Sequence, residues 1–116
     1  MVDVLRALQQ RLAAFAAERD WEQFHSPKNL AMALSVEASE LVEEFQWLTE
    51  EQSQALDTER RERVRLELAD VFIYLLRLAD RLDVDLLRAA DDKIAQNEKK
   101  YPAERVRGDS RKYTEY

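Results

Sequence analysis

The sequence contains no cysteine, one glycine and two prolines among its 116 residues. Without cysteine the chain can form no disulfide, so nothing in it implies an oxidising compartment. Glycine and proline are the residues that disfavour helices most, and alanine, leucine, glutamate and arginine are abundant. This composition predicts a chain that is nearly all helix. A chain of this length can bury one hydrophobic core, so we expect a single domain.

Basic residues are outnumbered by acidic ones, and the sequence contains no long hydrophobic run. The chain has 18 Lys and Arg against 24 Asp and Glu, which gives a formal net charge of -6. Proteins that coat nucleic acids are normally basic, so we expect no nucleic-acid partner. The first six residues are followed by neither a signal-peptide core nor an apolar run of about 18 residues. We therefore expect no membrane partner and a cytoplasmic location.

The spacing of apolar residues predicts four helices in an all-α fold. Ser26 and Pro27 suit the cap and the first position of the second helix, and Asp85 suits the cap of the fourth. The polar segment 49–58 lacks a clean period and is interpreted as a loop. Pro102 ends the last helix, so we expect a helical domain over 1–102 and a C-terminal tail over 103–116. The four predicted helices cover about 3–19, 27–48, 59–82 and 86–101.

Two pairs of carboxylates stand out, because each pair is spaced three residues apart on one side of a helix. Glu37 and Glu40 form the first pair, and Glu67 and Asp70 form the second. Glu37 falls inside a narrow apolar stripe, where an unpaired carboxylate is costly to bury. Four acids directed into one interhelical space would also repel each other. A divalent cation would resolve both problems, and ligands that are all oxygen favour Mg²⁺ or Mn²⁺. The alternative is that these acids are ordinary solvated surface charges.

The third predicted helix is apolar on two faces, and a small four-helix domain can cover only one of them. We interpret the second face as a contact between subunits, which predicts a homodimer or homotetramer. The fourth helix has one apolar side, and Asn97 falls within it. The core stripe of the third helix is Val64, Leu68, Val71, Leu75, Leu78 and Leu82, its second face is Leu66, Ala69, Ile73 and Leu76, and the buried side of the fourth helix is Leu86, Leu87, Ala90, Ile94 and Tyr101.

Aromatic and polar residues near the ends of the second helix suggest a ligand site. Four residues could form a slot for a flat ring with one polar edge, namely Trp21, Phe24, His25 and Trp47, although ordinary packing at the end of a bundle is the simpler alternative. Tyr74 lies one turn beyond Asp70 and so faces the side of the acids. On the fourth helix, Lys93, Asn97 and Lys100 lie on one side, where they could meet phosphate oxygens.

Several runs of the sequence resemble one family. They are ERDWEQFHSPKNLAMALSVEASELVEEFQW, ELADVFIYLLRLADRLDVDL, KIAQNEKKYP and SRKYTE. Together they resemble the MazG-like nucleotide pyrophosphohydrolases, and within that group the all-α dCTP pyrophosphatases are the most similar. The similarity extends from about Leu5 to Glu115. It implies an oligomeric four-helix MazG-like bundle that hydrolyses nucleoside triphosphates to monophosphate and pyrophosphate with Mg²⁺, and dCTP or a modified dCTP is the implied substrate.

The resemblance also implies roles for individual residues. It places the four acids in the metal site, Trp21 and Trp47 near the base, and Tyr74, Lys93 and Asn97 around the substrate. Relatives often have glycines beside the first acidic pair, whereas this chain has Val36 and Ser39 there, and Leu12 replaces a polar residue. The loss of the glycines narrows the space beside the first acidic pair but leaves every acid in place, and the Leu12 replacement bears on which base is preferred more than on the reaction.

The resemblance further implies how the reaction and the tail work. Water attacks the α-phosphorus, pyrophosphate leaves, and one acid takes the proton, for which we choose Glu40. In the tail, Arg111 and Lys112 are expected to bind the triphosphate, whereas composition alone favours a disordered basic end. A non-catalytic helical oligomerisation module, with the acids as a charged rim, is the alternative function.

Overall fold

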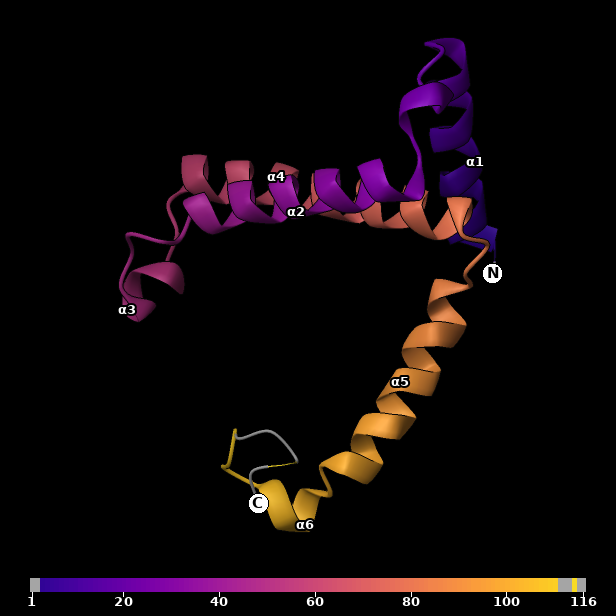
Figure 1. Cartoon of the computed structure of the whole chain (residues 1–116). Coiled ribbons are helices and arrows are strands. Elements are labelled where there is room, and N and C mark those ends of the chain that lie inside the picture. The colour runs from indigo at the N-terminus through magenta and orange to yellow at the C-terminus, as the bar shows by residue number, and fades with distance from the viewer. Residues whose placement is uncertain (1–2, 111–113, 115–116) are drawn as a thin grey trace. The chain divides into compact units, whose positions relative to one another are not determined.

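The computed structural model describes residues 3–110 and 114, and all regular secondary structure in these residues is helical (Figure 1). This confirms the expected all-α class. The chain divides into two compact units, Met1–Asp83 and Val84–Tyr116. The packing of four helices in one bundle stays a prediction, as does the division into a domain over 1–102 and a tail. Within the described residues, no helix combines the length and the apolar character needed to cross a membrane.

The first unit contains three long helices. They are α1 (Asp3–Glu18), α2 (Pro27–Glu43) and α4 (Thr58–Arg81). α2 and α4 run side by side, and α1 packs against α4 (Figure 1). A short 3₁₀ helix, Glu22–Phe24, lies between α1 and α2, and the short helix α3 (Glu50–Ser53) lies between α2 and α4.

Side-chain caps fix where the helices begin. The Ser26 hydroxyl accepts a hydrogen bond from the Asn29 N–H at 3.2 Å, and Pro27 occupies the first helical turn, as predicted. The segment predicted to be a loop contains α3, whose capping box joins Thr49 and Gln52. The sequence prediction missed this helix because a single turn has no measurable apolar period.

α2 ends five residues before the predicted end at Leu48. The Arg60 guanidinium donates to the backbone carbonyl of Glu44, an acceptor that a continuing helix would give to the Leu48 N–H. The Leu48 N–H instead donates to the Phe45 carbonyl at 2.9 Å. A contact with a residue 16 positions away therefore ends the helix, and apolar periodicity contains no information about it.

The core of the first unit corrects the assignment of faces on α4. Leu76, predicted to meet another subunit, is fully buried, and its carbonyl accepts a hydrogen bond from the Gln9 side chain of α1 at 3.1 Å. Leu66 is 51% exposed, and Leu68, assigned to the core, is 53% exposed. The error arises because α1 covers only part of the length of α4, so one stripe is buried at one end and exposed at the other.

The second unit contains α5 (Leu86–Lys100) and the short helix α6 (Ala103–Val106). The Asp85 carboxylate caps α5 by accepting from the Arg88 N–H at 3.1 Å, as predicted. The predicted burial of Asn97 and Ile94 is wrong, because both side chains are exposed. Within the described part of this unit, α6 is the only other helix, and four residues cannot cover the apolar side of a 15-residue helix.

Candidate active site

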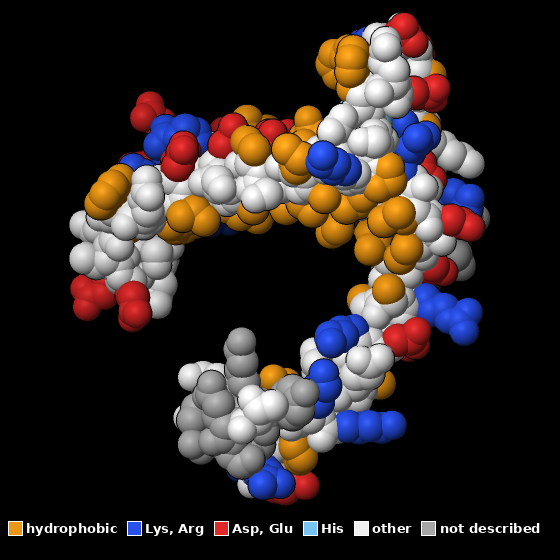
Figure 2. All heavy atoms as spheres, viewed as in Figure 1, with side chains coloured by type: hydrophobic (Ala, Val, Ile, Leu, Met, Phe, Trp, Pro, Cys, Tyr) orange, Lys and Arg blue, Asp and Glu red, His pale blue; other side chains and the backbone are white. Residues whose placement is uncertain are grey.

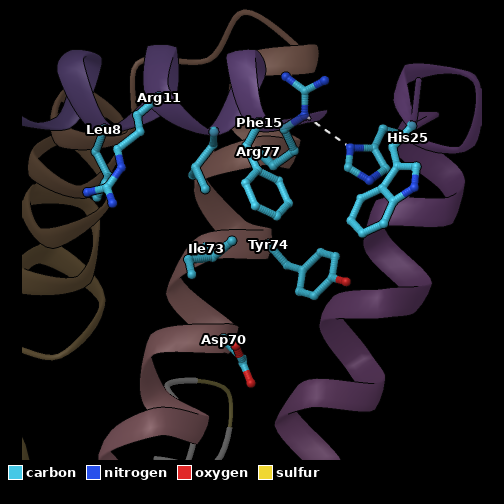
Figure 3. A pocket seen from close by; sticks show the side chains of 10 residues that line it. Leu8, Arg11, Phe15, His25, Asp70, Ile73, Tyr74 and Arg77 are labelled. Carbon is cyan, nitrogen blue, oxygen red and sulfur yellow. Dashed lines mark hydrogen bonds between the residues drawn. The ribbon is translucent and has the colours of Figure 1, made fainter. Parts of the chain in front are cut away.

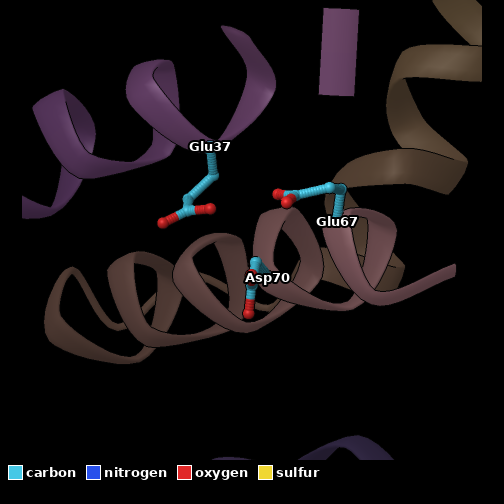
Figure 4. Close-up of side chains that lie close together, drawn as sticks. All are labelled: Glu37, Glu67 and Asp70. Atoms are coloured by element: carbon cyan, nitrogen blue, oxygen red, sulfur yellow. The ribbon is translucent and has the colours of Figure 1, made fainter. Parts of the chain in front are cut away.

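Three of the four predicted metal-binding acids converge between α2 and α4. Glu37 comes from α2, while Glu67 and Asp70 come from α4, and Figure 4 shows their side chains in one interhelical space. One carboxylate oxygen from each lies within 4.8 Å of the other two. The three-residue spacing on α4 places Glu67 and Asp70 on the same side of that helix, and the packing of α2 against α4 brings Glu37 to them.

Glu40 lies next to this group of three acids. The pKa of Glu37 is raised to about 7, first by burial and then by the neighbouring Glu40, Asp70 and Glu67 carboxylates. The pKa of Glu67 is also raised, first by burial and then by the negative charge of Glu40 and its other acidic neighbours. The carboxylates of Glu40, Glu67 and Asp70 therefore all lie close enough to Glu37 to affect its pKa, and the assignment of the four acids to a metal site stays a prediction. Other acids of the same two helices, such as Glu43 and Glu59, are exposed.

The acidic site fits a cation better than it fits an empty cluster. The Oε2 atoms of Glu37 and Glu67 are buried and have no hydrogen-bond partner among the described residues. A buried carboxylate oxygen without a partner is costly, and neighbouring like charges add to the cost. A bound divalent cation removes both penalties, and carboxylate oxygens are the ligands preferred by Mg²⁺.

A cavity of about 420 Å³ adjoins the acids (Figure 3). Asp70 belongs both to the acidic group and to the lining of this cavity. The cavity wall includes three residues that the sequence assigned to substrate binding, namely Trp21, His25 and Tyr74. Its size is within the range of small-molecule sites, and its lining is mostly apolar with a few polar groups. The remaining lining residues are Leu8, Arg11, Leu12, Phe15, Ile73 and Arg77.

Ring contacts order one wall of the cavity. The Phe15 and Trp21 rings meet edge to face with centroids 5.7 Å apart, and Trp21 lies 6.5 Å from the His25 ring at a tilt of 56°. The Arg19 guanidinium covers the Phe15 ring at 3.6 Å. Because Trp21 is still 44% exposed, part of its ring is free to pack against a flat ligand.

Other predicted substrate residues do not lie in this cavity. Trp47 is 86% exposed and follows α2, whereas Trp21 precedes it. The 17 residues of α2 separate the two ends by roughly 25 Å, so one chain cannot bring both tryptophans to one ring. Lys93 and Asn97 are exposed on α5 in the second unit, and their roles stay predictions. Arg111 and Lys112 lie outside the described residues.

The sequence analysis missed Arg77, which is 5% exposed and lines the cavity. Its Nε–H donates to the Nδ1 atom of His25 at 3.2 Å, and its Nη1 atom lies 3.5 Å from the Asp80 carboxylate. The available signal was an arginine inside the apolar run Leu75–Ala79. A charged residue in such a position requires a polar partner, which here comes from a loop 52 residues away.

Comparison with known proteins identifies the family. The model of the MazG-like family matches residues 32–116, which include both acidic pairs. The chain belongs to the MazG-like family. This MazG-like chain is 52% identical over 105 residues to human dCTP pyrophosphatase 1 and 49% identical over 105 residues to the protein of the same name from Rattus norvegicus. In both comparisons the match covers 89% of this chain, which spans only 62% of the length of these curated relatives.

A solved structure resembles the same MazG-like chain. It is the crystal structure of a pyrophosphatase from Archaeoglobus fulgidus, which is 39% identical and superimposes with a TM-score of 0.79. The match covers 84% of this chain and 91% of the archaeal one. Identity at this level, together with the TM-score, supports a common fold as well as common descent.

Proposed function

We propose that this protein is a Mg²⁺-dependent nucleoside triphosphate pyrophosphohydrolase that acts on dCTP or a modified dCTP. The observation that carries the proposal is the position of Asp70, which joins the acidic group to the aromatic cavity. A nucleotide has two parts that match this arrangement. Its flat ring suits the aromatic cavity, and its anionic phosphates suit a metal ion held by the acids. The names of the human and rat relatives support dCTP as the substrate.

Glu37, Glu67 and Asp70 would hold the metal, with Glu40 beside them. We favour Mg²⁺, and Mn²⁺ would satisfy the same oxygen donors. When bound, the metal neutralises phosphate charge and stabilises the charge that develops during phosphoryl transfer.

Glu40 is the acid that we assign as general base. It is half-buried next to Glu37 and Glu67 but is not one of the three acids whose oxygens converge most closely. It would orient a water and take its proton as the water oxygen bonds to the α-phosphorus. The bond from that phosphorus to the bridging oxygen then breaks, releasing pyrophosphate and leaving the nucleoside monophosphate.

The cavity residues would bind the base. Trp21 offers the face or edge of its ring, Tyr74 lies on α4 one turn beyond Asp70, and His25 supplies a polar edge.

We further propose that the fold is completed as an oligomeric four-helix bundle, a homodimer or homotetramer. In this arrangement Lys93, Asn97 and the tail residues Arg111 and Lys112 would supply polar groups and cations to the phosphates, and Trp47 would reach the base of a neighbouring copy.

Pyrophosphate release from a panel of nucleoside triphosphates, with and without Mg²⁺, tests this proposal. We expect release from dCTP to exceed release from the other nucleotides and to require the metal. Glu40→Gln should abolish turnover, whereas Glu59→Gln, which changes an exposed acid of α4, should leave it intact. A protein that releases no pyrophosphate from any nucleotide yet forms a stable oligomer would instead be the non-catalytic oligomerisation module.

A further inference from the structure

Arg77 is a buried charge at one end of the cavity. It lies on α4 seven residues beyond Asp70, so the two side chains lie on one side of the helix two turns apart. Its Nη2 atom is buried and has no hydrogen-bond partner among the described residues. Burying a guanidinium with an unpaired donor costs stability, and residues that carry such a cost tend to serve a site.

The contact with His25 defines which imidazole nitrogen carries the proton. A guanidinium can only donate, so the Nδ1 atom that receives the Arg77 Nε–H at 3.2 Å must be unprotonated. A neutral imidazole has one proton, which must then be on Nε2. Figure 3 shows the bond, with the Arg77 and His25 side chains meeting above the cavity.

The surroundings of His25 also favour the neutral imidazole. The pKa of His25 is lowered by burial first, then by the positive charges of Arg77 and Arg81 on α4, while Glu22 of the 3₁₀ helix opposes this with a smaller effect. Among the described residues, these are the charged groups that shift the pKa of the ring, and the Trp21 ring lies 6.5 Å from it between centroids. At neutral pH His25 is therefore a neutral donor at Nε2 with no acceptor function left.

We propose that Arg77 is a positioning residue, which holds His25 as the Nε2–H tautomer so that His25 donates a hydrogen bond to an acceptor on the flat ring bound beside Trp21. The proposal rests on the proposed nucleotide function and adds a specificity element to it. The ring must present a carbonyl oxygen or an unprotonated ring nitrogen at this edge. Cytosine offers both, as O2 and N3, whereas its amino group would place a second donor against the Nε2–H and would be excluded from this edge.

His25 is the only histidine in the chain, so its ring can be observed by itself. Nitrogen-15 NMR of the imidazole in the full-length protein distinguishes the two tautomers directly. We expect protonated Nε2 and unprotonated Nδ1 at neutral pH, with a pKa below the ordinary value of about 6.5. A wild-type ring protonated on Nδ1 would overturn the proposal without any variant.

Variants at two arginines separate the effect of the hydrogen bond from the effect of the charge. Arg77→Met removes both, so we expect a mixture of tautomers and a rise in the His25 pKa toward its ordinary value. Arg81→Met removes only a neighbouring charge, because no hydrogen bond joins Arg81 to His25 in the described structure, and the Nε2–H tautomer should persist. Arg77→Lys retains a donor and should keep most of the Nε2–H population. If the His25 ring of the Arg77→Met variant keeps the wild-type tautomer and pKa, Arg77 has only a structural role.

Ligand binding completes the test with dCMP, the expected product, as the probe. Adding dCMP should move the Nε2 resonance, whereas 2-deoxyribose 5-phosphate, which lacks the ring, should leave it in place. Arg77→Met should raise the KM for dCTP about tenfold with kcat little changed, the loss expected for about one hydrogen bond, and Arg81→Met should not. If the protein hydrolyses dCTP but the Nε2 resonance does not shift when dCMP is added, this inference is wrong and the proposed function stands. Failure of the wild-type protein to hydrolyse any nucleotide overturns the proposed function.

Discussion

Single residues show where sequence reasoning succeeds and where it stops. Glu37 could be singled out because a carboxylate inside an apolar stripe violates a local pattern, and the other three acids because of their three-residue spacing. Arg77 violates the same pattern, but its partner His25 lies in a loop before α2, so the reason for it is tertiary. Local sequence patterns therefore indicated the acidic group, whose role in metal binding stays a prediction, and only part of the cavity that adjoins it.

The pKa of Glu37 predicts how two properties depend on pH: the stability of the protein without metal, and the affinity of the site for Mg²⁺. Folding raises this pKa from an ordinary 4.5 to about 7, so between these values the folded state holds a proton that the unfolded state has released. The protonated Glu37 carboxyl therefore contributes its full share of folding stability below pH 4.5, and this share is lost as pH rises through about 7. Because Mg²⁺ must displace this proton, its affinity should fall about tenfold for each pH unit below 7.

Thermal melts without metal and Mg²⁺ titrations, each across this pH range, check the prediction. Glu37→Gln removes the titrating group, so its melting temperature should vary less with pH than that of the wild type and exceed it on the alkaline side. A wild-type melting temperature that rises from pH 5 to pH 8 in step with that of Glu37→Gln would contradict the assigned pKa.

Replacing a metal-binding acid should separate activity from stability. We expect Glu37→Ala and Asp70→Ala each to lower turnover by about 10²-fold or more, because the charge of the metal would be poorly held. Both should melt at or above the wild-type temperature without metal, since one repulsive charge is gone. Steady-state pyrophosphate release and calorimetry measure the two effects, and near-normal turnover in either variant would refute the metal assignment.

At the scale of elements, periodicity predicted the long helices well and their ends less well. α1 and α4 match the predicted ranges within one residue at each end, and the Asp85 cap of α5 was also predicted, because these features depend on local residues. The end of α2 depends on Arg60 and Arg63 of α4, which both bind the Glu44 side chain. The end of α2 cannot be predicted from local sequence, because it depends on α4 packing beside it.

Glu44 should therefore stabilise the turn between α2 and α3. Its carboxylate is 17% exposed and lies 3.4 Å from Arg60 and 3.1 Å from Arg63. We expect Glu44→Gln to lower the free energy of unfolding by about 1–2 kcal/mol, since partly buried charge-assisted bonds exceed ordinary surface pairs. Denaturant unfolding measures this change. Glu43→Gln is the matched control, because Glu43 is the exposed neighbour of Glu44. Equal stability of the two variants would show that the ion pairs contribute nothing.

The whole molecule leaves large apolar side chains exposed. Figure 2 shows hydrophobic side chains gathered along one side of the α2 and α4 pair. On α4, Leu68, Phe72 and Leu75 are 53%, 41% and 37% exposed and recur at the spacing of one helical face. Of the α4 face that the sequence predicted to meet another subunit, Leu76 is buried by packing within the chain while Leu66 is exposed, and the contact between subunits stays a prediction.

This exposed stripe predicts that the protein assembles through α4. An exposed apolar strip along a helix is typical of a contact between subunits, and a monomer would leave it in water. Light scattering at micromolar concentration should therefore give a mass of at least twice the 13.7 kDa of one chain. Phe72→Glu should reduce that mass to one chain, because a charge at the centre of the strip would be desolvated in the contact. Val4→Glu provides the control, since Val4 is 71% exposed on α1 and outside the strip. A wild-type mass of one chain would reject the assembly, and dissociation by Val4→Glu but not by Phe72→Glu would place the contact on α1.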